Sequence, residues 1–211
     1  MKLLLLTVCL ASALLRTAEA LRCHTCNDEI CSSSASVNCP ATSNACQTVT
    51  RVTSPPGTVT VVKNCSSVQN CTTPLTLETE WSVNRGYRRE AFTQLCCVTD
   101  NCNMQTLATP STAVNGKLCP SCANSTQSQA GSCDATASCL GAEDSCFSGN
   151  TTLNSRDVLN AGCLSRNLCG NVAALKTLLG ENPRIVCGAP SSISLSMALL
   201  ICAPTAYKVL S

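Results

Sequence analysis

Cysteine is the residue type whose spacing says most about the chemistry of this chain, because cysteines at fixed intervals form either disulfides or metal sites. The sequence of 211 residues contains 20 of them. Most fall into two ladders, each opening with Cys-x-x-Cys. The first ladder consists of Cys23, Cys26, Cys31, Cys39, Cys46, Cys65, Cys71, Cys96, Cys97 and Cys102. The second, shorter ladder consists of Cys119, Cys122, Cys133, Cys139, Cys146, Cys163, Cys169 and Cys187.

A zinc ribbon is one chemistry that two Cys-x-x-Cys pairs can provide, since four thiolates make a tetrahedral site. The N-terminus favours disulfides instead. Lys2, an apolar run over 3–15 and the small residues ending at Ala20 predict a secretory signal peptide cleaved after Ala20. Secretion delivers the ladders to an oxidising compartment. His24 is the only histidine, so we expect no metal site and no cofactor.

The cysteines are expected to hold the fold together. Between the signal peptide and the C-terminal tail the only aromatic residues are Trp81, Tyr87, Phe92 and Phe147, so each half of the chain can bury little apolar surface. Loss of one native disulfide from a small secreted domain costs about 2–5 kcal/mol, against a total stability of about 5–15 kcal/mol. Disulfides therefore have to supply much of the stability.

The repeated ladder predicts two small domains. After the signal peptide, residues 1–20, the first domain is expected over 21–104 and the second over 118–187. Residues 105–117 are small and polar, with a proline and no cysteine, and are predicted to be a linker. Residues 188–211 form a C-terminal tail.

β-Branched residues and turn signals predict β-hairpins in both domains. Thr/Val-rich runs flank Ser54-Pro55-Pro56-Gly57, which predicts a hairpin over 47–64. A second strand pair is expected from 72–80 and 88–95, with the turn over 82–86. In the second domain we expect a hairpin over 147–162 and, because alanine and leucine are spaced for a helix, a short helix over 171–180.

The two ends of the first ladder carry a resemblance to a known family. Leu21-Arg22-Cys23-His24-Thr25-Cys26 opens it, and Cys96-Cys97-Val98-Thr99-Asp100-Asn101-Cys102-Asn103 closes it. This pattern resembles the lymphocyte-antigen-6/urokinase-receptor family of three-finger domains. The resemblance covers nearly all of the mature chain. It implies an all-β, disulfide-rich fold of two tandem three-finger domains of the snake-toxin type, in which disulfides fix the roots of three β loops.

The resemblance also implies a disulfide pairing, which spacing alone does not determine. In the first domain the implied bonds are Cys23–Cys46, Cys26–Cys31, Cys39–Cys65, Cys71–Cys96 and Cys97–Cys102. In the second they are Cys119–Cys146, Cys122–Cys133, Cys139–Cys163 and Cys169–Cys187. The second domain departs from the pattern, since it has no counterpart of Cys97–Cys102 and no closing Cys-Asn.

The tail after Cys187 indicates whether the protein is attached to a membrane. Its apolar segment, 193–203, is too short for a transmembrane helix of about 20 residues. Small residues followed by a modest apolar end favour a glycosylphosphatidylinositol signal, with Gly188 or Ser191 as the attachment residue. We therefore expect a lipid-anchored protein on the outer leaflet of the plasma membrane. The alternative is a secreted soluble protein that keeps its C-terminus, in which Cys202 could bond with Cys187.

Four Asn-x-Ser/Thr sequons predict exposed, glycosylated asparagines in a secreted chain. They start at Asn64, Asn70, Asn124 and Asn150. Asn124 and Asn150 lie in hydrophilic stretches. Asn64 and Asn70 each precede a cysteine, so quick disulfide closure would leave them only partly modified.

A basic stretch on the third finger of the first domain is the candidate partner-binding site. Arg85, Tyr87, Arg88 and Arg89 combine the two residue types that are enriched at interface hot spots. A solvated loop with ordinary surface charge is the simpler interpretation of the same residues. Trp81 on this finger is expected to pack against the domain rather than to contact a partner.

Catalysis and nucleic-acid binding have little support. One histidine beside a disulfide cannot serve a nucleophile and its base, and the acidic pair Glu143-Asp144 has no context that would raise a pKa. The net charge is +2, without a basic stripe interleaved with aromatic residues.

We expect a non-enzymatic, glycosylated receptor or adhesion molecule whose finger tips bind an extracellular protein ligand. The alternative is a soluble inhibitor, because the chain is also similar to two-domain three-finger phospholipase inhibitors.

Overall fold

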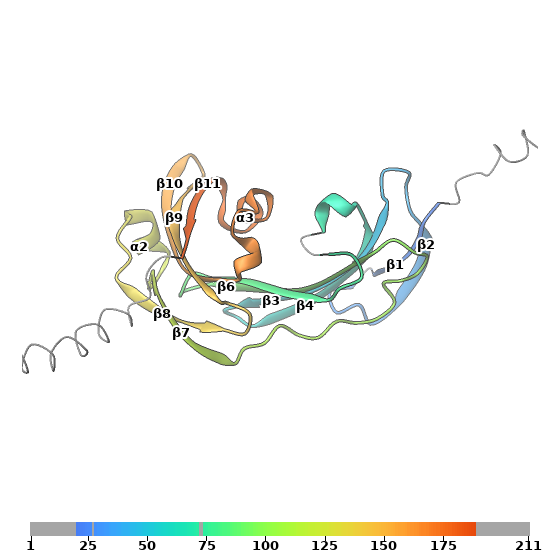
Figure 1. Cartoon of the computed structure of the whole chain (residues 1–211), viewed down its shortest axis with the longest axis horizontal. Coiled ribbons are helices and arrows are strands. Elements are labelled where there is room, and N and C mark those ends of the chain that lie inside the picture. The colour runs from blue at the N-terminus through green and yellow to red at the C-terminus, as the bar shows by residue number, and fades with distance from the viewer. Residues whose placement is uncertain (1–19, 27, 72–73, 189–211) are drawn as a thin grey trace, which may run out of the picture.

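The computed structural model describes residues 20–26, 28–71 and 74–188. The signal peptide and the lipid-anchor tail predicted from the sequence lie outside these ranges, apart from Ala20 and Gly188. Within them most of the ordered elements are β-strands (Figure 1). We call residues 20–104 the first module, residues 105–113 the strap, and residues 114–188 the second module.

The first module consists of three β-hairpins, which are its fingers. The strand pairs are β1 (Arg22–Cys26) with β2 (Ser34–Asn38), β3 (Ala45–Ser54) with β4 (Thr58–Ser66), and β5 (Thr79–Asn84) with β6 (Arg89–Cys97). Strand β6 also pairs with β3, which joins the second and third fingers. The β3–β4 pair confirms the hairpin predicted over 47–64. A short 3-10 helix, η1 (Val68–Asn70), follows β4.

The third finger is shifted from the position predicted for it. Its first strand covers 79–84 instead of 72–80, and the turn is closed by a hydrogen bond from Arg85 N to Arg88 O. The prediction was wrong because it assigned residues 82–84 to the turn. Trp81 and Val83 instead extend the strand into a buried surface shared with the second module. Thr72 and Thr73 lie outside the described residues.

The second module has two β-hairpins, followed by helices and a final strand in place of the third hairpin. Its strands are β7 (Val114–Ser121), β8 (Ala135–Leu140), β9 (Ser145–Leu153), β10 (Arg156–Leu164) and β11 (Glu181–Cys187). Its helices are α2 (Ser125–Ala130), the 3-10 helix η2 (Arg166–Leu168) and α3 (Val172–Leu179). The β9–β10 hairpin and α3 confirm the elements predicted over 147–162 and 171–180. Asn171 starts α3 by accepting a hydrogen bond from Ala174 N.

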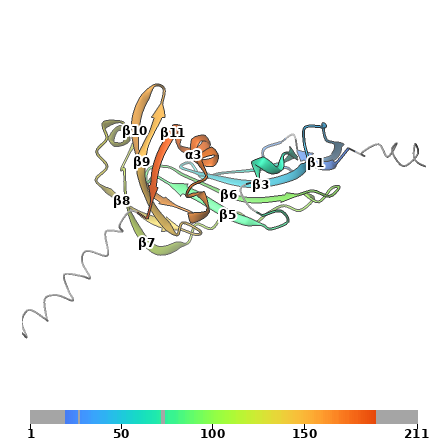
Figure 2. The same ribbon diagram turned by 45° about the horizontal axis from the view of Figure 1, so that its top comes forward.

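The two modules share one sheet. Its strand order is β11-β9-β10-β5-β6-β3-β4, and the junction is a short antiparallel pairing of β10 with β5 at Cys163↔Asn84 and Leu164↔Val83. Ser82 extends the junction, because its N–H donates to Ser165 Oγ at 2.8 Å and its carbonyl accepts from Ser165 N at 3.0 Å. Figure 2 shows β9, β10 and β11 of the second module rising steeply from this junction.

One apolar core lies on both sides of the junction. It combines residues of the first module with residues of β9, β10, η2 and α3, namely Trp81, Val83, Phe92, Phe147, Leu164, Leu168, Ala174, Leu175 and Leu179. These side chains are almost fully buried. Neither module therefore completes its core alone, and docking adds apolar burial that each small module lacks.

The strap lies along the opposite face of the sheet from α3, as the long green segment in Figure 1 shows. Thr50 Oγ1 donates to Leu107 O at 3.3 Å, and Leu107 is only 4% exposed. Lys63 donates to the carbonyl of Met104 just before the strap, and burial lowers the pKa of this lysine. The predicted linker also ends early, since residues 114–117 belong to β7. This segment is thus packed against the sheet, rather than a free tether.

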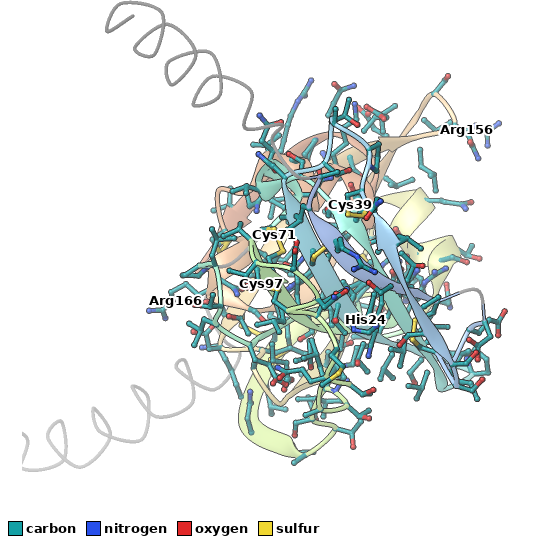
Figure 3. All side chains as sticks on the ribbon, turned by 90° about the vertical axis from the view of Figure 1, so that its right-hand side faces the viewer. His24, Cys39, Cys71, Cys97, Arg156 and Arg166 are labelled. Carbon is teal, nitrogen blue, oxygen red and sulfur yellow. A yellow bond between two sulfur atoms is a disulfide. The ribbon has the colours of Figure 1, made fainter. Side chains whose placement is uncertain are left out.

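Among the described residues, nine disulfides hold the roots of the fingers. In the first module they join Cys23 to Cys46, Cys26 to Cys31, Cys39 to Cys65, Cys71 to Cys96, and Cys97 to Cys102. In the second they join Cys119 to Cys146, Cys122 to Cys133, Cys139 to Cys163, and Cys169 to Cys187. Figure 3 looks onto the end of the first module, where Cys39, Cys71 and Cys97 are labelled.

Candidate functional site

A groove of 490 Å³ lies on the face of the sheet that carries α3. Strands β3, β5 and β6 form its floor, with Val49, Trp81 and Phe92 among the floor residues. One wall is α3, which contributes Ala173 and Leu178, and the other is the end of η1 with Cys71. Both walls rise from the same face of the sheet in Figure 1. The groove is therefore built from both modules and exists only when they are docked.

The floor of the groove is a stacked aromatic pair. Trp81 and Phe92 face each other across β5 and β6, with ring centroids 4.1 Å apart and planes 19° apart. The guanidinium of Arg51, on the neighbouring strand, lies over the Phe92 ring at 5.4 Å from its centroid. Trp81 is 7% exposed, so it packs as predicted while it also lines the groove. Such aromatic stacks give a binding site a rigid apolar base.

Three arginines converge on one carboxylate at the groove. Glu90 lines the groove and lies 2.6 Å from Arg51, 3.0 Å from Arg88 and 3.9 Å from Arg85. Arg85 also lies over the Tyr87 ring, 5.4 Å from its centroid. We call Arg51, Arg85, Arg88 and Glu90 the arginine cluster; it carries an excess of two positive charges.

The predicted basic patch is thus divided. Arg85, Tyr87 and Arg88 lie near the groove, and Arg51 from β3 joins them. Arg89 does not, because it points to the other face of β6 and is 5% exposed. Its Nε donates to Glu143 Oε1 at 2.6 Å. The prediction that Arg89 binds a partner is therefore corrected: Arg89 forms a buried contact between the modules.

Glu143 is the residue that the sequence interpretation missed. It is fully buried and also accepts hydrogen bonds from Ser82 Oγ at 3.1 Å, Asn84 Nδ2 at 3.2 Å and Leu140 N at 2.9 Å. Two of these donors come from β5 of the first module. The pair Glu143-Asp144 looked isolated because the side chains that bind the Glu143 carboxylate, those of Ser82, Asn84 and Arg89, are more than fifty positions away along the chain. Only the docked arrangement of the modules reveals them.

The four sequon asparagines lie at the surface. Asn64 is on β4, Asn124 caps α2 through its side chain, and Asn150 is on β9; all three are exposed. Asn70 is also exposed, but it lines the groove. Its carbonyl accepts a hydrogen bond from the Gln94 side chain at 3.3 Å, which ties the end of η1 to the floor. A glycan on Asn70 would therefore stand at the mouth of the groove.

All cysteines of the two ladders are in disulfides. In two places three cysteine sulfur atoms lie close together. One group is Cys23, Cys39 and Cys65, and the other is Cys119, Cys139 and Cys163. Each of these residues is already in a disulfide. A bonded sulfur is not the thiolate that a metal requires.

These features define a class: proteins made of β fingers rooted in disulfides, here with two three-finger domains in tandem. The sequence profile of the u-PAR/Ly-6 domain matches residues 19–105 and 115–188, and the chain belongs to this family. Among curated proteins, none matches the chain with significance. Domains of this family are extracellular or cell-surface binding modules, generally without enzymatic activity, so the chain is an extracellular binding protein. In the residues that the structure describes, every helix is too short or too polar to cross a bilayer.

Proposed function

We propose that this protein is a lipid-anchored, non-enzymatic cell-surface receptor or recognition molecule that binds a protein partner in the groove between its modules. The observation that carries the proposal is the groove itself, with its aromatic floor of Trp81 and Phe92. Its volume lies within the range of about 300–1,000 Å³ that is usual for small-molecule pockets, so it has room for side chains of a partner. The groove replaces the finger tips as the main contact surface in this proposal.

The rigidity of the groove supports binding. Disulfides at Cys46, Cys96 and Cys97 fix β3 and β6 of the floor, and the buried Arg89–Glu143 pair and the β10–β5 pairing fix the second module, which carries α3. A site that is ordered before binding loses less conformational entropy on association. A partner would therefore meet a surface that is already formed.

Filling the groove tests the binding role. Ala173 is exposed on α3 and lines the groove, so Ala173→Phe would occupy it without disturbing the core. Val172→Phe, at the exposed neighbouring position outside the groove lining, is the matched control. Binding of the purified, multimerised protein to cells should be lost with Ala173→Phe and kept with Val172→Phe. Equal binding of both variants would refute the groove as the contact surface.

Anchoring needs its own test, because the tail lies outside the described residues. Gly188, the proposed attachment residue, is exposed at the end of β11, and its N–H donates to Cys146 O at 2.9 Å. A phosphatidylinositol-specific phospholipase should release the protein from expressing cells. Intact mass should place the C-terminal residue of the released form at Gly188. A mature form that keeps Cys202 would favour the soluble inhibitor instead.

A further inference from the structure

We infer that the partner segment that fits the groove presents a carboxylate next to an apolar side chain. This inference rests on the proposed function, since it names the chemistry of the partner for that same groove. It follows from the charges, the hydrogen-bonding groups and the apolar surface of the described residues.

The charge at the groove is unbalanced. Arg51, Arg85 and Arg88 share Glu90 as their acidic partner, and within the described residues no other acidic group forms an ion pair with them. The side chains of Arg51 and Arg88 are 42% and 47% exposed, so both can turn toward a ligand. A second carboxylate beside Glu90 would bring the cluster close to neutrality. Arginine forks bind carboxylates in a bidentate geometry, which gives this contact direction as well as charge.

Hydrogen-bond donors are also in excess. Trp81 Nε1 and Arg51 Nε, both on residues of the groove floor, have no hydrogen-bond acceptor among the described residues. Trp81 is more than nine-tenths buried, and a buried donor without an acceptor destabilises the unbound protein. A small adjustment of the floor residues on binding would let a ligand oxygen accept from one of them. The groove thus favours a ligand that brings acceptors, which a carboxylate does.

The apolar part of the groove lies beside the arginine cluster. Val49 and Phe92 on the floor and Leu178 on α3 line the groove next to Arg51 and Glu90. An aliphatic or aromatic side chain in contact with them would be removed from water, which favours binding. The charged and apolar surfaces are adjacent, so one short segment can reach both.

A random peptide library displayed on phage provides the probe. The target is the mature protein purified from cells that express the full chain. Peptides that also bind the Ala173→Phe variant are removed in a counter-selection. Enriched peptides should share Asp or Glu within a few residues of an apolar side chain. Changing that acid to its amide should weaken binding about tenfold or more, as should Arg88→Gln. Arg156→Gln is the matched control, since Arg156 is exposed on β10 and stands away from the molecule in Figure 3.

The outcomes separate this inference from the proposed function. Some peptides could fail to bind Ala173→Phe and yet share no acidic residue, or could bind Arg88→Gln and Arg156→Gln equally well. Either result would overturn the inference and leave the groove as the binding site. Peptides that bind regardless of Ala173→Phe, or a failure to enrich any groove-dependent peptide, would count against both. A misfolded variant would also lose binding. The disulfide pairing of each variant is therefore checked by peptide mapping.

Discussion

Arg89 Nε lies 2.6 Å from Glu143 Oε1, in a contact that joins β6 of the first module to the second module. Arg89 also donates from Nη2 to Ser111 O of the strap at 2.9 Å. One buried guanidinium thus contacts all three parts of the chain. Because both charges are removed from water, each needs the other to remain stable in the folded state.

Breaking this pair should destabilise the whole protein. Glu143→Gln leaves a buried guanidinium without its counter-charge, and we expect a loss of about 3–5 kcal/mol in the free energy of unfolding. Urea unfolding followed by fluorescence of Trp81, which lies at the module interface, is the measurement. Lys176→Met removes the exposed Lys176–Glu181 pair and should cost less than about 1 kcal/mol. Equal losses for the two variants would show that the buried pair has no special role.

The module junction depends on a glycine. A Cβ at Gly162 on β10 would overlap the carbonyl oxygen of Asn84 on β5, so Gly162→Ala should force the strands apart. We expect a loss of about 1–3 kcal/mol from overpacking and an increased radius of gyration in solution scattering. Gly116→Ala is the control, because Gly116 also has a positive φ but an added Cβ meets no neighbour. If both variants keep the wild-type radius, close approach at Gly162 is not what holds the modules together.

Asn103, the asparagine that closes the first ladder, should stabilise the root of the first module. It is fully buried, donates to His24 O at 2.9 Å and Gln47 O at 3.1 Å, and accepts from His24 N at 2.8 Å. Asn103→Ala would leave these groups unpaired, at a cost of about 1–3 kcal/mol. Thermal unfolding should show a clear drop in Tm, whereas Asn167→Ala at an exposed position should not. A drop of similar size in both would contradict this role.

A glycan on Asn70 should restrict the groove. Thr72→Ala removes the sequon and leaves Asn70 in place, so peptides selected for the groove should bind more tightly to this variant than to the glycosylated protein. Thr126→Ala removes the Asn124 sequon on α2, which lies outside the groove lining, and should change nothing. Mass spectrometry must first show that Asn70 is occupied. Unchanged peptide affinity after loss of an observed Asn70 glycan would rule out this restriction.

The local elements were largely predictable from the sequence. Thr/Val runs around Ser54–Gly57 predicted the β3–β4 hairpin, and the spacing of alanine and leucine predicted α3. Both signals are short in range, because they depend on backbone preference and on turn chemistry. The disulfide pairs followed from family resemblance and not from spacing, as two ladders of this length allow many pairings.

The groove and the junction were not predictable in the same way. Val83 was assigned to a turn and Trp81 to its edge, since nothing nearby in sequence shows that Leu164 pairs with Val83 in the sheet and shares a core with both residues. Glu143 and Arg89 are 54 positions apart. Their pairing depends on which edges of the two modules meet. Helix α2, with few apolar residues, left no periodic pattern to detect.

The strap has a further consequence for the integrity of the molecule. Every disulfide lies within one module, so in the described residues the strap is the only covalent connection between the two halves. A single proteolytic cut there would turn one folded chain into two chains held by the shared sheet and core. Their association would then depend on concentration. On dilution the N-terminal fragment would dissociate, the groove would lose its floor, and the C-terminal fragment would remain with α3 uncovered.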